Sequence, residues 1–111
     1  MERADEFFKV LEVGDLAEGE GCVVQAGIKK IALFRVDGQY HAIQNHCPHA
    51  GGFLGLGDLS GTQLVCPRHA WVFDVASGNC LSNPRYCVKQ YRTRLEDGWV
   101  LVGVPDDGKL M

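Results

Sequence analysis

The chain has little positive charge, no long hydrophobic run and no stretch with a helical repeat of apolar residues. Its 11 lysine and arginine residues are outnumbered by 14 aspartate and glutamate residues, which gives a formal net charge of -3. Binding to nucleic acid is not expected, because no basic stripe is available to replace phosphate counterions. The longest apolar runs, residues 31–34 and 99–102, are far shorter than the ~20 residues of a membrane span.

The beginning of the chain also lacks the hydrophobic segment of a secretory signal, since residues 1–6 are mostly polar or charged. We therefore expect a cytoplasmic protein that is not anchored to a membrane. The cysteine count is five, an odd number that does not suit a disulfide framework. Cys22, Cys80 and Cys87 are scattered along the chain, and we expect them to be ordinary small side chains in a reducing compartment.

Strand signals dominate what is present. Asp-Gly pairs at positions 37–38 and 97–98 each separate two apolar runs, a pattern typical of hairpins with a tight type I′ turn. Because strands recur at short spacing and no helical period is visible, the sequence predicts an all-β sandwich or small barrel. At 111 residues, we expect one domain over residues 1–111. The predicted strands cover residues 7–13, 22–26, 30–36, 39–44, 63–65, 71–74, 87–95 and 99–104.

Two short segments carry a complete set of metal ligands. The sequence CPH occupies residues 47–49, and CPRH follows at residues 66–69 after a gap of sixteen residues. A proline follows each cysteine and fixes its own φ, which helps to hold the loop in place. Thiolates and imidazoles suit either zinc or an iron–sulfur cluster, so the ligand types alone leave both open. The candidate ligands are Cys47, His49, Cys66 and His69.

The pattern C-x-H, sixteen residues, C-x2-H resembles the Rieske family, in which two cysteines hold one iron of a [2Fe-2S] cluster and two histidines hold the other. The run W-V-F-D at residues 71–74, followed by Gly78, is similar to the W-x-F-D…G run of soluble Rieske ferredoxins and oxygenase Rieske domains. The resemblance implies a Rieske-type β base with a small inserted cluster-binding lobe over about residues 45–74. It also implies that Cys47, His49, Cys66 and His69 hold a [2Fe-2S] cluster.

Some positions depart from the membrane-bound members of that family, which have an extra cysteine in each box and join the two by a disulfide. Gly52 and Arg68 occupy those positions here. Trp71 and Phe73 match a serine and a tyrosine whose hydroxyls bond to the cluster region in those members. The loss of these donors implies a reduction potential near the low end of the Rieske range, about -150 mV.

The remaining residues near the boxes have other expected roles. His46 is adjacent to Cys47, but neighbouring residues in an extended loop point apart, so we expect a histidine that faces solvent. Asp74 is expected to cap a turn, and Trp71 either shields the cluster or fills the core. The glycine-rich residues 50–58 lack the features of a phosphate-binding loop, and we expect them to let the backbone curl around a compact group.

The resemblance implies electron transfer and not catalysis. Ring-hydroxylating oxygenases also need a mononuclear iron, and only His41 and His46 remain once the four ligands are assigned. We therefore expect a ferredoxin that carries one electron from a flavin-containing NAD(P)H reductase to a terminal oxygenase. Two alternatives remain open, the small subunit of an assimilatory NAD(P)H nitrite reductase and a zinc-stabilised binding module without redox activity. The overall acidity favours docking onto a positively charged surface.

Overall fold

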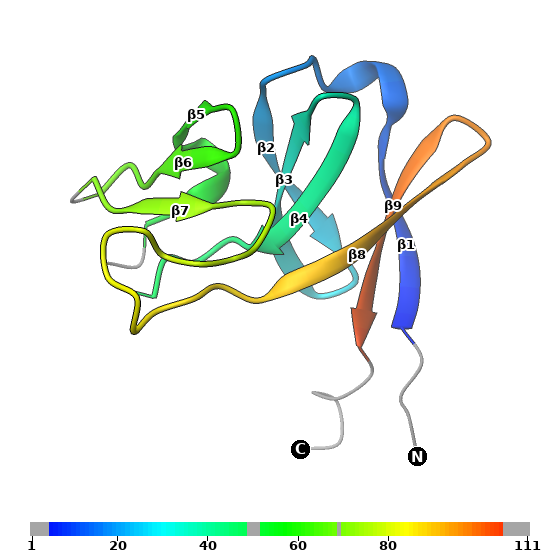
Figure 1. Ribbon diagram of the computed structural model, residues 1–111. Helices are drawn as coiled ribbons and strands as arrows, with labels where there is room; N and C mark the ends of the chain where they lie inside the picture. The colour runs from blue at the N-terminus through cyan, green and yellow to red at the C-terminus, as the bar shows by residue number, and fades with distance from the viewer. Residues whose placement is uncertain (1–4, 49–51, 69, 106–111) are drawn as a thin grey trace.

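The structure is a computed structural model in which residues 5–48, 52–68 and 70–105 are described. These residues form two antiparallel sheets and two short 3-10 turns, and they contain no α-helix (Figure 1). The six-stranded sheet has the order β1-β9-β8-β4-β3-β2, and the three-stranded sheet has the order β5-β6-β7. The larger sheet consists of β1 (Asp5–Glu12), β2 (Gly21–Ala26), β3 (Lys29–Val36), β4 (Gln39–Gln44), β8 (Gln90–Glu96) and β9 (Trp99–Pro105). The smaller sheet consists of β5 (Asp58–Ser60), β6 (Gln63–Val65) and β7 (Val72–Asp74), and the 3-10 turns are η1 (Val13–Asp15) and η2 (Leu54–Leu56). The all-β prediction is confirmed.

Both predicted Asp-Gly hairpins are present. Asp37 and Gly38 join β3 to β4 with φ of 52° and 77°, and Asp97 and Gly98 join β8 to β9 with φ of 51° and 82°. Positive φ at both central residues is the property that a type I′ turn requires. A third two-residue turn, Gly27-Ile28, joins β2 to β3, and no Asp-Gly or Asn-Gly pair signals it.

Several limits differ from the predicted strands. β1 covers Asp5–Glu12 and not residues 7–13, since Val13 begins η1, and β7 begins at Val72 and not at residue 71. β8 begins at Gln90 and not at residue 87, because Cys87 forms an isolated pair with Asn79 instead. The glycine-rich segment after the first ligand box contains η2 and the short strand β5. Its compactness has a steric cause: a Cβ on Gly57 would lie 2.3 Å from the carbonyl oxygen of Val65.

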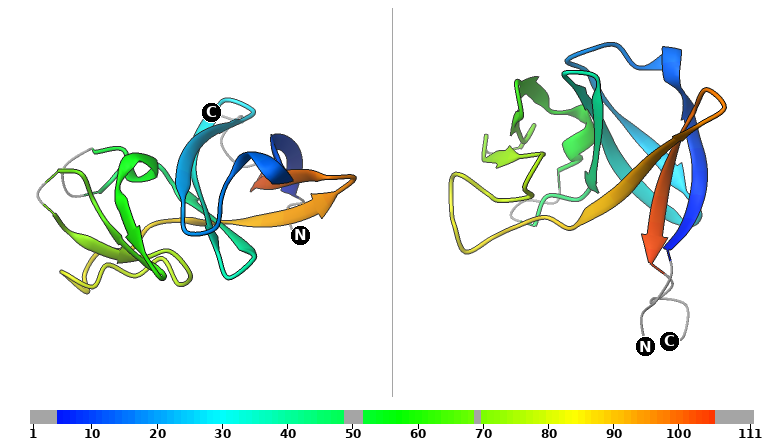
Figure 2. Two further views of the ribbon diagram at one scale, coloured as in Figure 1. Left: turned by 90° about the horizontal axis from the view of Figure 1, so that it is seen from above. Right: turned by 45° about the vertical axis from the view of Figure 1, so that its right-hand side comes forward.

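The buried side chains form two separate clusters. The six-stranded sheet is curled, so that its edge strands β1 and β2 approach each other and enclose one cluster around Ile31, Leu33 and Val102 (Figure 2). The second cluster contains Phe73 and Leu64 from the small sheet, and it also contains Cys47 and Cys66. The candidate ligands therefore belong to the core that links the two sheets.

Residues 45–89, which connect β4 to β8, are called the site segment below. It holds the small sheet and lies beside the curled sheet, away from β1 and β9 (Figure 1). It is fixed to the larger sheet through η2, since a Cβ on Gly55 would lie 2.9 Å from the carbonyl oxygen of Cys22 on β2. No helix in the described part of the chain is long and apolar enough to span a membrane.

Candidate metal centre

The two loops that carry the candidate cysteines are built in the same way. The backbone N–H of Cys47 donates to the carbonyl oxygen of Gly52 at 2.9 Å, and that of Cys66 donates to the carbonyl oxygen of Trp71 at 2.7 Å. In each loop the acceptor lies five residues after the cysteine. The pairing at the base of each loop is similar, with an isolated antiparallel bridge between His46 and Phe53 and a strand pairing of Val65 with Val72. Each cysteine thus begins a closed loop with a fixed backbone.

The two cysteine side chains meet in the core. Cys47 is 3% exposed and Cys66 is 1% exposed, and the two side chains lie close enough for Cys47 to raise the pKa of Cys66. Burial raises the pKa of the Cys66 thiol above its ordinary value, the backbone N–H of Arg68 lowers it by donating to the sulfur, and the contact with Cys47 raises it again. Metals bind the thiolate form, so two adjacent buried thiols offer a site whose protons a metal displaces.

The two histidines of the predicted ligand set, His49 and His69, lie outside the described residues. Among the residues that are described, no group of three or more histidine, cysteine or acidic side chains comes together. Of the four predicted ligands, the described part of the structure contains Cys47 and Cys66, and it brings these two side chains together in the core.

Gly52 and Arg68 lie close together across the two loops. A Cβ on Gly52 would lie 3.1 Å from the sulfur of Cys66 and 3.1 Å from Cγ of Arg68. These are the positions at which the membrane-bound Rieske proteins have their extra cysteines. In this chain the glycine lets the first loop approach the sulfur, and the aliphatic part of Arg68 covers the contact.

Aromatic side chains surround the second loop. Phe73 is fully buried, and Trp71 is partly buried against the core cluster that contains the two cysteines. Trp71 also makes an edge-to-face contact with Tyr86, with ring centroids 5.2 Å apart.

Asp74 caps a turn as predicted, since its carboxylate accepts from the N–H of Ala76 at 2.9 Å. His46 is exposed, as predicted, and packs edge-to-face on Phe53.

One residue of the site was not predicted from the sequence. Asn45 is 1% exposed and stands between β4 and the first loop. Its side-chain oxygen accepts from the backbone N–H of Gly55 at 3.0 Å, and its carbonyl oxygen accepts from that of Leu54 at 2.7 Å. The only sequence signal is an asparagine directly after an apolar strand, and it does not show that the partner lies ten residues ahead.

Two matched loops with a pair of buried, adjacent thiols make this small all-β protein a candidate for the class of metal-binding β proteins. Within that class, residues 6–92 match the family model for the Rieske [2Fe-2S] domain. The chain therefore belongs to the Rieske family, and the predicted [2Fe-2S] cofactor is confirmed at the level of the family. Family membership thus favours the cluster over a single zinc ion.

The relatives include small electron carriers. The chain is 32% identical over 108 residues to the ferredoxin component of the alkene monooxygenase system of Xanthobacter autotrophicus, covering 94% of this chain and 88% of that one. Its fold is similar to the ferredoxin of Sphingomonas yanoikuyae B1, with a TM-score of 0.82, 31% identity, and 90% and 100% of the two chains covered. Ferredoxin components are electron carriers and not catalytic enzymes, which confirms the predicted class of activity.

Two further solved structures bear on the partners. One is described as the small subunit of an NADH-dependent nitrite reductase from Mycobacterium tuberculosis, with a TM-score of 0.83, 26% identity, and 90% and 96% of the two chains covered. The other is a complex of oxygenase and ferredoxin in carbazole 1,9a-dioxygenase, in which the matched chain has a TM-score of 0.80, 28% identity, and 87% and 92% coverage. Protein redox partners are thus the common feature of these relatives.

Proposed function

We propose that Cys47 and Cys66 hold one iron of the [2Fe-2S] cluster and that His49 and His69 hold the other. The described residues fit this role, because two buried thiols from different loops are already in contact. Gly52 leaves the space beside the Cys66 sulfur free of a side chain. When bound, the cluster supplies a reversible one-electron store.

Groups of the protein itself position and shield the two cysteine sulfurs that would bind the cluster. The matched backbone hydrogen bonds of the two loops hold the sulfurs in place before the metal binds. Burial of both cysteines excludes water from the sulfurs. The N–H of Arg68, which donates to the sulfur of Cys66, stabilises negative charge on that sulfur, as hydrogen bonds around iron–sulfur sites generally do.

We further propose that the protein carries single electrons from an NAD(P)H-dependent flavin reductase to a terminal oxygenase. The observation that supports this most is the match to the ferredoxin component of an alkene monooxygenase system, over 94% of this chain and 88% of the relative. The proposed location is the cytoplasm, where both partners and the nicotinamide donor would be available. No membrane or nucleic-acid partner is part of the proposal.

A second candidate is the small subunit of an NAD(P)H-dependent nitrite reductase. The similarity to the Mycobacterium tuberculosis structure favours it, since that TM-score of 0.83 is comparable to the 0.82 of the ferredoxin. The two functions share the cluster and differ in the acceptor. The ferredoxin assignment is preferred because the sequence identity to the ferredoxin, 31%, exceeds the 26% to the nitrite reductase subunit.

The test is stepwise electron transfer with purified components. The loaded protein should take up one electron in a spectroelectrochemical titration. Once reduced, it should be reoxidised by the oxygenase of carbazole 1,9a-dioxygenase faster than by dissolved oxygen alone. Turnover with a nitrite reductase large subunit, with no transfer to an oxygenase, would favour the second candidate. A protein that takes up no electron would contradict both.

A further inference from the structure

The site segment carries most of the large apolar side chains that are exposed among the described residues. The structure has six large hydrophobic side chains that are exposed among the described residues, and four of them belong to the site segment: Phe53, Leu56, Leu81 and Tyr86. Phe53 and Leu56 come directly after the first ligand loop, and their exposed fractions are 43% and 66%. Contiguous exposed apolar side chains rimmed by polar residues are typical of interaction sites.

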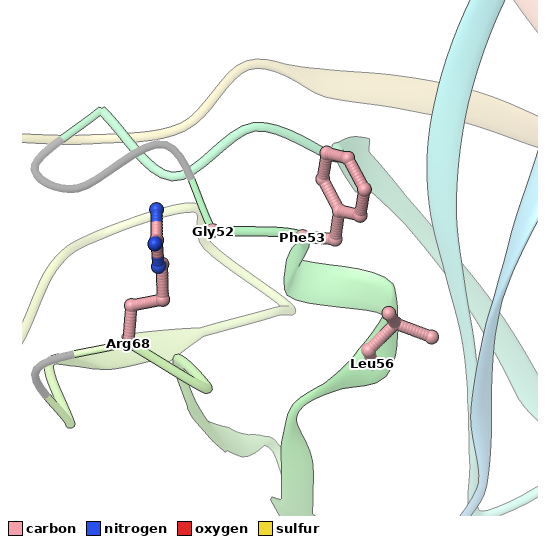
Figure 3. A pocket seen from close by; sticks show the side chains of 4 residues that line it. All are labelled: Gly52, Phe53, Leu56 and Arg68. Carbon is pink, nitrogen blue, oxygen red and sulfur yellow. The ribbon is translucent and has the colours of Figure 1, made fainter.

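A pocket lies between these side chains and the second loop. Gly52, Phe53, Leu56 and Arg68 line it, and its volume is about 210 Å³. Figure 3 shows Arg68 on one side and Phe53 and Leu56 on the other, so that both loops contribute. Pockets for small molecules are typically about 300–1,000 Å³. This pocket is below that range and suits a side chain of a protein partner.

The formal charge of the site segment differs in sign from that of the whole chain. Of the 11 basic and 14 acidic residues of the chain, the site segment contains three basic and two acidic ones, which leaves eight basic and twelve acidic residues elsewhere. Arg68 lines the pocket, and none of the other three lining residues is charged. The overall charge of -3 would favour a positively charged partner, but Arg68, the charged residue of the pocket lining, favours an acidic contact there.

We propose that this pocket is the docking point for the electron acceptor, and that the acceptor contributes an apolar side chain beside a carboxylate. The apolar side chain packs on Phe53 and Leu56, and the carboxylate pairs with the Arg68 guanidinium. This inference rests on the proposed electron-carrier function. It adds the chemistry of the partner's contact surface.

The test compares matched variants of the loaded protein in stopped-flow electron transfer to two haem proteins, basic cytochrome c and acidic cytochrome b5. Arg68→Glu keeps the Cβ and Cγ atoms that contact Gly52, and Arg94→Glu is its control on β8. Each variant replaces a positive by a negative charge and so changes the formal net charge from -3 to -5. If docking uses Arg68, R68E should slow transfer to cytochrome b5 and speed transfer to cytochrome c, each by about tenfold at low salt. R94E should change neither rate by more than about twofold.

A second pair of variants tests the apolar contact. Leu56→Ser and Leu95→Ser both remove an exposed leucine, since the exposed fractions are 66% and 55%, but Leu95 lies on β8 of the other sheet. L56S should slow transfer to both acceptors by about fivefold, as expected for an apolar anchor at an interface, and L95S should not. Equal effects within either pair of variants would overturn the docking proposal.

The electron paramagnetic resonance (EPR) signal of each reduced variant shows whether the cluster is present, and so distinguishes a failure of the docking proposal from a failure of the electron-carrier function. If the cluster signal is retained in all variants but the rates within each pair agree, the docking proposal fails and the carrier function stands. If the unsubstituted protein has no cluster signal, both are contradicted.

Discussion

At the scale of single residues, Gly52 sets how closely the two loops approach. The sulfur of Cys66 cannot easily move away from a new Cβ, since the backbone of Cys66 is held by Trp71. We predict that Gly52→Ala lowers the iron and acid-labile sulfide content per chain by about half or more, because overpacking a tight contact costs ~1–3 kcal/mol. Chemical analysis of both elements after reconstitution measures the effect.

The control for that substitution is Gly14→Ala. A Cβ on Gly14 meets nothing within 4 Å, so this variant should load as much iron as the unsubstituted protein. Full loading of G52A would show that the space beside the Cys66 sulfur is not part of the centre.

Glu18 stabilises the turn between β3 and β4, which is not part of the candidate metal centre. Its carboxylate accepts from the backbone N–H groups of Asp37 and of Gly38 and lies 3.8 Å from the Arg35 guanidinium. The pKa of Glu18 is lowered, first by the hydrogen bond from Gly38 and then by that from Asp37. Desolvation opposes them, and the Arg35 charge lowers the pKa by less than desolvation raises it. Because the pKa of Glu18 is lower in the folded protein than in the unfolded chain, its ionised carboxylate stabilises the fold at pH values above the unfolded-chain pKa. This stabilisation is lost as the pH falls through the lower pKa of the folded protein.

We therefore predict that Glu18→Gln lowers Tm at pH 7 and that the difference from the unsubstituted protein narrows as the pH falls below 4.5, the ordinary value for this group. Thermal unfolding followed by circular dichroism over that pH range is the measurement. Glu6→Gln, at an exposed position on β1, shows the effect of removing one negative charge elsewhere. A difference that stays constant from neutral pH to acid would contradict the assignment of Glu18.

At the scale of elements, Asn45 joins the end of β4 to η2. Its hydrogen bond to the Gly55 N–H is buried, so Asn45→Ala leaves a buried donor without an acceptor, which costs about 1–3 kcal/mol. Asn83 provides the control, because its side-chain oxygen also accepts from a backbone N–H, that of Arg85 at 3.0 Å, but this hydrogen bond is exposed. We predict that N45A lowers the free energy of unfolding in urea by about 2 kcal/mol and that N83A costs less than half as much. Equal losses of unfolding free energy in N45A and N83A would mean that burial of the Asn45 hydrogen bond does not add to its contribution to stability.

The sequence predicts most of the strands but not all of their limits. The Asp-Gly hairpins were predictable because φ > 0 at two successive positions restricts the residue types that fit. The first residue of β8 was not, since Cys87 pairs with Asn79 across a loop that no local pattern describes. β5 and η2 were also missed, because glycine-rich segments take their shape from tertiary contacts such as that of Gly55 with β2.

The same limit applies to the centre. The spacing of the boxes pointed to Cys47 and Cys66, and the structure places their thiols together in the core. Asn45 and the pocket of Phe53, Leu56 and Arg68 could not be predicted, since they depend on how η2 packs between the sheets. Chemical ligands are visible in a sequence pattern, whereas the surface beside them is a property of packing.

At the scale of the whole molecule, the two buried clusters suggest unequal dependence on the cofactor. The cluster inside the curled sheet contains neither candidate cysteine ligand, and the other contains both. Because binding of a metal is coupled to folding of its site, we predict that removal of iron increases amide hydrogen exchange in the site segment while β3, β4 and β9 stay protected. Exchange mass spectrometry of the loaded and iron-free protein measures this. A loss of protection throughout the chain would contradict the division into two clusters.

The account depends on a [2Fe-2S] cluster with two cysteine and two histidine ligands, and pulsed EPR of the dithionite-reduced protein tests this most directly. We predict a rhombic [2Fe-2S] signal that is coupled to two histidine nitrogens and that is lost in Cys47→Ser and in Cys66→Ser. A bound metal without an EPR signal, or a signal without nitrogen coupling, would contradict the account.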